Sequence, residues 1–182
     1  MAESVDNQAY QALVELSRQG LASAKGLPAQ VDITPHWSGV GFELLGQRFV
    51  APMGEVAEML EVPIHARIPN VQSWVRGVAN VRGRLLPLFD LAAFFGDKLR
   101  GARNTRRVLV LETEDLYSGL IVDQVFGMQH FPVDSFASEA EDVPESVASF
   151  VSGSYRHAGS EWRVFSPRLL EQDARFMDVA QA

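Results

Sequence analysis

The stretch that decides the fold is Trp74–Gly96, which reads WVRGVANVRGRLLPLFDLAAFFG. Apolar and partly β-branched residues stand on both sides of Gly83, a pattern typical of two short strands joined by a tight turn. Pro87 has no N–H to donate to a strand ladder, so we expect the second strand to lie at a sheet edge or at a bulge. The stretch therefore predicts a β-hairpin.

Short helices are expected on both sides of this hairpin. Asp90 is expected to cap a helix over Leu91–Phe95, which Gly96 would end. Upstream, Asn70 is expected to cap a second short helix that Gly77 would close.

The same stretch resembles the signature of the CheW-like family. Gly77-Val78-Ala79-Asn80-Val81-Arg82-Gly83 matches G-V-x-N-x-R-G, and Leu86-Pro87-Leu88-Phe89-Asp90-Leu91 matches a hydrophobic-Pro-hydrophobic pair followed by D-L. The resemblance extends over roughly residues 38–175. Members of this family are adaptors that couple chemoreceptors to a histidine kinase. The resemblance implies a mainly β fold, with two small SH3-like β-barrel lobes and short accessory helices.

Composition restricts the class of protein. The chain has 182 residues, of which 47% are apolar, so it can form a core in one moderate domain or two small lobes. It has no cysteine, which excludes a disulfide framework, a thiol nucleophile and a cysteine metal site. The N-terminus lacks a signal-peptide pattern, and no apolar run approaches the length of a membrane span. We expect a cytoplasmic protein without direct membrane insertion.

Charge is unevenly distributed along the chain. The net charge of −7 disfavours a general nucleic-acid binder. Basic residues gather between positions 76 and 107: Arg76, Arg82, Arg84, Lys98, Arg100, Arg103, Arg106 and Arg107. Acidic residues gather between positions 133 and 145: Asp134, Glu139, Glu141, Asp142 and Glu145. Each segment by itself is typical of a solvated loop, but the asymmetry indicates contact with partners of opposite charge.

Residues 1–36 are expected to form a helical extension and a linker. Apolar residues recur at the three-to-four spacing of an amphipathic helix: Tyr10, Leu13, Val14, Leu21 and Ala24. From Lys25 to Trp37 the chain holds glycine and proline with little periodicity, which indicates a linker. The helix either docks on a partner or covers an exposed sheet edge of the domain, and the need to cover edges favours the second role.

Residues 37–178 are expected to form the CheW-like domain, with the boundary between its lobes in the polar, basic segment 97–107. Further strands are expected over residues 40–45, 48–53, 108–111, 116–122, 126–131, 147–155 and 162–165, and a strand or a turn over residues 56–62. Ser166 is expected to cap the last helix, with Pro167 at its first position. That helix would have one apolar face, formed by Leu169, Leu170, Phe176 and Met177.

No catalytic or metal-binding constellation is recognised. None of the four histidines, His36, His65, His130 and His157, stands at a metal-ligand spacing. Hydrolase and nucleotide-binding motifs are absent from the sequence. Asp90 and Asp123 stand at expected strand ends, where capping or turn closure is favoured over a catalytic pair. Trp37, Trp74 and Trp162 are expected in the core or between the lobes. We expect no enzymatic activity, no cofactor and no metal.

The family resemblance implies partner contact at Val56, Glu58, Gly77 and Arg82, by position. Arg82 is expected to donate a forked hydrogen-bond pair to a partner, to tie down the hairpin turn through backbone carbonyls, or both. Gly77 also has a structural interpretation, as the glycine that ends a helix. Asn80 is expected to stabilise the turn.

The favoured hypothesis is a non-enzymatic adaptor between the cytoplasmic tip of a methyl-accepting chemoreceptor and a CheA-type histidine kinase, recruited to membrane receptor arrays. The long N-terminal extension, and N-V-R-G in place of the commoner N-L-R-G, resemble the branch that serves type IV pilus systems and twitching motility. One alternative is a small β-barrel module that binds peptide or RNA outside signalling, which the basic segment supports. Another is an enzyme with an unrecognised site.

Overall fold

The computed structural model describes residues 3–23, 35–113 and 116–181. The chain divides into two compact units, Met1–Ile33 and Thr34–Ala182. The first contains the helix α1 (Glu3–Ser23), in which apolar residues such as Leu13 and Leu21 are exposed. Whether this helix docks on a partner or on the domain stays a prediction. Within the described ranges, no helix combines the length and hydrophobicity that a membrane crossing requires.

The expected linker lies largely outside the described residues, and its expected end at Trp37 is wrong. The first strand already begins at His36, because residues 36–39 pair with the end of a later strand, at Gln129–Pro132. This partner is 90 to 96 positions away in the sequence, so local composition does not show it.

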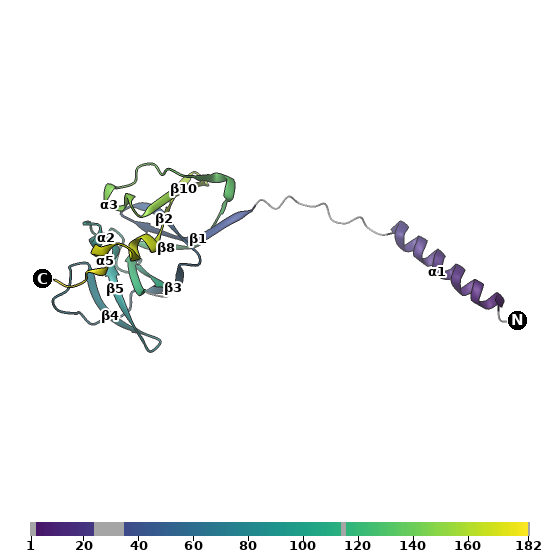
Figure 1. The fold of residues 1–182 in the computed structure, drawn as a ribbon, viewed down its shortest axis with the longest axis horizontal. Helices are drawn as coiled ribbons and strands as arrows, with labels where there is room; N and C mark the ends of the chain where they lie inside the picture. Colours follow the sequence, from purple (N-terminus) through teal and green to yellow (C-terminus); the bar gives the residue numbers. More distant parts are fainter. Residues whose placement is uncertain (1–2, 24–34, 114–115, 182) are drawn as a thin grey trace. The chain divides into compact units, whose positions relative to one another are not determined.

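The second unit is mainly β, as predicted (Figure 1). Its strands are β1 (His36–Leu44), β2 (Gln47–Pro52), β3 (Val56–Glu61), β4 (Val75–Val81), β5 (Arg84–Asp90), β6 (Arg107–Glu112), β7 (Tyr117–Val122), β8 (Gln124–Pro132), β9 (Phe136–Ala137), β10 (Val151–His157) and β11 (Ser160–Phe165). Its helices are α2 (Leu91–Phe94), η1 (Val133–Ser135), α3 (Glu145–Ala148), α4 (Pro167–Glu171) and α5 (Ala174–Met177).

The strands form two sheets, and the chain passes from the first sheet to the second and back again. The six-stranded sheet has the order β8-β1-β2-β11-β10-β9, and the five-stranded sheet has the order β3-β6-β7-β5-β4. The chain leaves the first sheet after β2 and returns to it at β8, so the lobes are not consecutive halves. The lobe boundary predicted at 97–107 is wrong, because that segment connects α2 to β6 within the five-stranded sheet. The polar composition of this segment reflects its exposure to solvent. The point where the chain passes from one sheet to the other depends instead on strand pairing between distant residues.

One hydrophobic core joins both sheets and the C-terminal helices. It includes Phe42 and Phe165 of the first sheet, Leu109 and Leu120 of the second, and Phe176 of α5, all almost fully buried. Each sheet also has a smaller cluster of its own. Trp74 belongs to the shared core and Trp162 to the cluster of the first sheet, against which the half-buried Trp37 packs. The tryptophans therefore lie in core positions, as expected.

Asp123 connects the two sheets where the chain returns from β7 to β8. Its side chain is completely buried. One carboxylate oxygen accepts the N–H of Leu45 at 3.1 Å, and the other accepts the N–H of Gly101 at 2.7 Å. Leu45 lies in the β1–β2 turn and Gly101 in the loop before β6. The predicted turn-closing role is confirmed, and it extends to holding two loops together.

The helix expected between Asn70 and Gly77 is wrong. β4 begins at Val75, and Gly77 lies inside this strand at a φ of 139°, next to a bulge. The neighbouring connection explains the conformation: Ala66 and Val78 exchange two backbone hydrogen bonds of 2.9 Å, which bring this connection against β4. A Cβ on Gly77 would lie 2.0 Å from the Ala66 carbonyl oxygen. The glycine serves a close approach of two backbones rather than a helix end.

The β1–β2 hairpin turns one residue earlier than expected. The turn residues are Leu45 and Gly46, both with positive φ (57° and 76°), whereas Gly46 and Gln47 were expected. Gln47 pairs with Leu44 and begins β2. The reason is that the buried carboxylate of Asp123 accepts the Leu45 N–H and so holds the apolar leucine in the turn.

The end of the chain forms two short helices, α4 and α5, instead of one. Ser166 stands at the N-cap of α4, as predicted, but its side chain makes no capping hydrogen bond there. Asp173 begins α5, where its side chain accepts the N–H of Arg175. Leu169 and Met177 were expected on one apolar face with Leu170 and Phe176. They are 40% and 53% exposed instead, because the break between α4 and α5 turns them toward solvent. Similarly, the strand expected from residue 147 begins at 151, after α3.

Candidate interaction site on the five-stranded sheet

The β4–β5 hairpin forms as predicted, and its turn consists of Arg82 and Gly83. Both have left-handed backbone angles (φ of 53° and 83°), which is what a two-residue turn of type I′ requires. The side-chain oxygen of Asn80 accepts the N–H of Gly83 at 2.9 Å, so the predicted turn-stabilising role of Asn80 is confirmed. Asp90 ends β5 and caps α2 through the N–H of Ala93 at 3.0 Å, as predicted.

Pro87 was expected at a sheet edge or at a bulge, and the edge position is wrong because β5 is an interior strand. The bulge of this strand pair lies on β4 between Val75 and Gly77, next to the position opposite Pro87. β5 lies between β4 and β7. Pro87 is opposite Val78, whose own N–H and C=O bond to Ala66 on the far side of β4. The nitrogen of Pro87 therefore faces away from β4, and pairing with β7 begins one residue later, at Leu88. The missing N–H interrupts no ladder hydrogen bond at this point.

The turn reaches across the open side of the sheet through an ion pair. Arg82 donates to the carboxylate of Glu58 on β3 at 2.5 Å. β3 and β4 are the two edges of this sheet, and among the described residues the ladder does not continue from one to the other. The side chain of Arg82 is 77% exposed, and that of Glu58 29%. The ion pair thus joins the tip of the hairpin to the opposite edge while it leaves the guanidinium open to solvent.

A second ion pair lies on the other side of the hairpin. Arg84 donates to the carboxylate of Glu112 on β6 at 2.7 Å, and its guanidinium lies 3.9 Å from the ring centre of Tyr117 on β7. Glu112 and Tyr117 are opposite each other in the ladder. The hydrogen bond to Glu112 raises the pKa of Arg84 above its usual value. Arg84 is positioned by a carboxylate and an aromatic ring at once.

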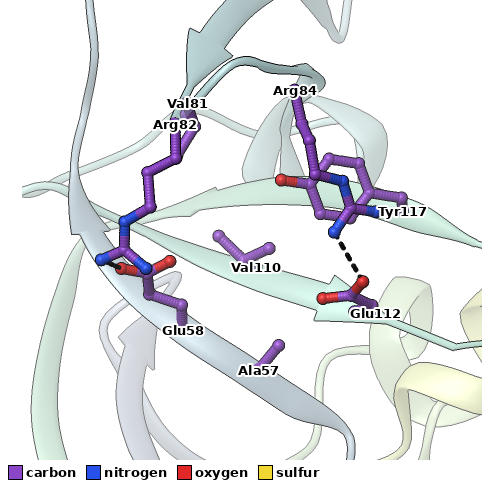
Figure 2. A pocket seen from close by; sticks show the side chains of 8 residues that line it. All are labelled: Ala57, Glu58, Val81, Arg82, Arg84, Val110, Glu112 and Tyr117. Atoms are coloured by element: carbon purple, nitrogen blue, oxygen red, sulfur yellow. Dashed lines mark hydrogen bonds and ion pairs between the residues drawn. The ribbon is translucent and has the colours of Figure 1, made fainter.

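These two ion pairs flank a pocket of about 240 Å³, which we call the hairpin pocket. In Figure 2, the Arg82–Glu58 pair and the Arg84–Glu112 pair stand apart, with Val110 and Ala57 between them. The lining residues are Ala57, Glu58, Val81, Arg82, Arg84, Val110, Glu112 and Tyr117. A small apolar floor with an exposed charged rim is an arrangement suited to contact with another protein.

The structure brings together two of the four residues that the resemblance implied. Glu58 and Arg82 line the hairpin pocket, whereas Val56 and Gly77 do not. Val56 is opposite Leu111 and packs against the shared core, with a bulge between it and Glu58. Gly77 is buried against Ala66. Neither Val56 nor Gly77 belongs to the pocket itself.

Sequence reasoning did not assign Arg84, Glu112 and Tyr117 to a site. Arg84 belongs to the basic segment between positions 76 and 107, and no pattern in the sequence singles out Glu112 or Tyr117. The approach of β5 to β7 is a parallel pairing between strands separated by α2 and β6, and no local pattern indicates such a pairing. In the part of the chain that the structure describes, no group of three or more His, Asp or Glu side chains is placed to hold a metal ion.

Comparison with known proteins assigns the family. The model of the CheW-like domain matches residues 38–174. The chain therefore belongs to the CheW-like family, as the motif over Gly77–Leu91 predicted, and its role is that of a chemosensory adaptor.

Individual relatives place the chain within the family. It is 49% identical over 171 residues to Protein PilI of Pseudomonas aeruginosa, a match that covers 94% of this chain and 96% of PilI. It is 30% identical over 115 residues to Protein FrzA of Myxococcus xanthus, covering 62% of this chain and 69% of FrzA. Among solved structures, the scaffolding protein TtCheW from Thermoanaerobacter tengcongensis matches with a TM-score of 0.67 at 23% identity, over 80% of this chain and 99% of TtCheW. This last likeness supports the fold.

Proposed function

We propose that the protein is the adaptor that couples the cytoplasmic tip of a methyl-accepting chemoreceptor to a CheA-type histidine kinase in a type IV pilus chemosensory system. The observation that carries the proposal is the 49% identity to PilI over nearly the whole of both chains. In this role the protein catalyses no reaction, and it is a cytoplasmic protein that its partners recruit to membrane receptor arrays.

The hairpin pocket is the proposed partner contact, with Glu58 and Arg82 as its direct contributors. An exposed ion pair contributes only about 0–1 kcal/mol to stability, so a partner carboxylate or carbonyl can engage Arg82 at little cost. The planar guanidinium presents several donors in a fixed geometry, which favours such an acceptor. Ala57 and the half-buried Val81 supply the apolar surface that a partner residue would cover, above the buried Val110.

Val56 and Gly77 contribute to the proposed contact indirectly. Val56 anchors the start of β3 on the shared core, and Gly77 lets the connection after β3 pack on β4. Both therefore set the separation of the two sheet edges that the Arg82–Glu58 pair joins. Substitutions at these positions would change binding by displacing Glu58 or the hairpin.

The decisive experiment compares Arg82→Ala with a matched variant, Arg156→Ala. Arg156, on β10 of the other sheet, forms an ion pair of the same length with Glu141 in the connection before α3, and is similarly exposed. Both variants should melt close to the parent protein, because each loses only an exposed ion pair. In titrations against the purified kinase and receptor tip, Arg82→Ala should weaken binding to at least one of them by about tenfold, and Arg156→Ala by less than twofold.

Two results would count against the proposal. One is equal affinity of the two variants for both partners. The other is that Arg82→Ala loses folded protein while the affinity per folded molecule stays the same, which would make Arg82 purely structural. Failure of the parent protein to bind any CheA-type kinase or receptor would reject the adaptor function itself.

A further inference from the structure

A second pocket, of about 530 Å³, lies on the same sheet and shares no lining residue with the hairpin pocket. We call it the loop pocket. It is formed by the connection from β3 to β4 (Ile64, Arg67), the start of β4 (Arg76) and the loop between α2 and β6 (Leu99, Arg103). These segments come together only in the folded chain.

The loop pocket carries three exposed arginines that have no ion-pair partner among the described residues. Arg67, Arg76 and Arg103 line it, and no acid among the described residues lies within ion-pair distance of any of them. A fourth arginine in the lining, Arg106, donates instead to the carbonyls of its own loop. Asp90 also lines the pocket, but it is buried and caps α2. In a chain with a net charge of −7, three unneutralised arginines around one cavity are a marked local excess.

Aliphatic surface accompanies this charge. Ile64 is 99% exposed, so its side chain makes almost no contact with the rest of the protein. Leu99 is half-buried and packs against the inner cluster of the five-stranded sheet. An aliphatic residue of a partner would remove the Ile64 side chain from water, which favours binding.

We propose that the loop pocket binds an acidic peptide segment that carries aliphatic residues. Its carboxylates would accept from Arg67, Arg76 and Arg103, and an aliphatic side chain would pack on Ile64 and Leu99. A nucleic acid fits less well, because bases need aromatic rings for stacking and the described lining offers mainly aliphatic side chains, with His65 as its one aromatic ring. Guanidinium groups match carboxylates through two parallel hydrogen bonds. This proposal does not depend on the kinase or the receptor.

The probe for the charged part is a fluorescein-labelled peptide with the sequence Glu-Glu-Leu repeated four times, titrated with the full chain by fluorescence anisotropy at low salt. The pocket variant carries Arg67→Gln, Arg76→Gln and Arg103→Gln. The control variant has the same net charge and carries Arg18→Gln, Arg156→Gln and Arg168→Gln, all exposed and outside the pocket. The pocket variant should bind about tenfold more weakly than the parent, and the control variant within about twofold.

The aliphatic part has its own test in Ile64→Ser. Because the side chain is exposed, this variant should fold and melt like the parent. It should bind the Glu-Glu-Leu peptide about threefold more weakly and bind a Glu-Glu-Ala peptide as the parent does. Equal sensitivity of the two peptides would contradict a contact between leucine and Ile64.

Two outcomes would overturn the proposal as a whole. The first is that the pocket variant and the control variant bind the peptide equally well, since the effect would then be one of net charge. The second is that a 12-nucleotide oligouridylate binds more tightly than the peptide and loses affinity in the pocket variant, which would assign the pocket to nucleic acid.

Discussion

Gly77 shows how one residue without a side chain decides the course of a strand. It combines a φ of 139°, which L-residues rarely adopt, with a carbonyl oxygen 2.0 Å from the position of a Cβ. That oxygen belongs to Ala66, and the hydrogen bonds between Ala66 and Val78 hold it in place. Gly77 is therefore a requirement of packing between backbones.

Gly77→Ala should lower the free energy of unfolding by about 3 kcal/mol, because backbone strain and a steric clash add together. Gly54→Ala is the matched control, since Gly54 has open space around its Cβ position and no positive φ. Its effect should stay within about 0.5 kcal/mol. Urea titrations of both variants give the comparison, and equal losses would refute the explanation.

Asp123 shows how one buried carboxylate side chain can hold two loops in place. Its two oxygens each accept a backbone N–H, from Leu45 and Gly101, so both loops depend on one carboxylate. Asp123→Asn would replace one acceptor by an NH2 group and leave one buried N–H without a partner. We expect a loss of about 2 kcal/mol in the free energy of unfolding. The exposed substitution Asp134→Asn should have almost no effect, and a similar loss in both would contradict this prediction.

The short helix α5 depends on its cap and on one buried ring. Phe176 stacks on Trp74, in the turn just before β4, with ring centres 5.4 Å apart, so α5 contributes directly to the shared core. Asp173 begins the helix and accepts from both the backbone N–H and the guanidinium of Arg175. The hydrogen bond from the Arg175 side chain is the main reason that the pKa of Asp173 lies below its usual value.

This lowered pKa predicts a pH dependence. A carboxyl group whose pKa is lower in the folded state contributes stability above its unfolded pKa of about 3.9, and that contribution is lost as the pH falls through the folded pKa. At pH 7, Asp173→Ala should cost about 1 kcal/mol of unfolding free energy, the usual value of an N-cap. The difference between parent and variant should shrink below about pH 4. A difference that stays constant down to pH 2 would contradict the capping role.

The two sheets of residues 34–182 share one core, and this decides how that unit unfolds. Buried residues from both sheets and from α4 and α5 form one continuous cluster. We expect a single cooperative transition, although the sheets have different strand orders. A variant that keeps only Trp74 reports on the shared core, and one that keeps only Trp162 reports on the separate cluster of the first sheet. In each variant, the fluorescence transition in urea should coincide with that of far-UV circular dichroism. Two separate midpoints within one variant would show independent lobes.

Local sequence patterns determined the features that depend on residues a few positions apart. Examples are the Arg82-Gly83 turn, the Asn80 side chain that stabilises it and the Asp90 cap of α2, because turns and caps are formed by neighbours in the chain. The family motif also lies in this short stretch, so membership was evident from the sequence.

Only the tertiary structure decided the features that depend on distant residues. The sequence suggested Glu58 and Arg82 separately, but their ion pair exists because β3 and β4 are opposite edges of one sheet. The pairing of β5 with β7, the close approach of Ala66 to Gly77 and the loop pocket have the same origin. Strand pairing is decided by which apolar faces bury each other across the whole unit. The strand pairing therefore depends on contacts between residues that are distant in the sequence, and no single stretch of the chain determines it.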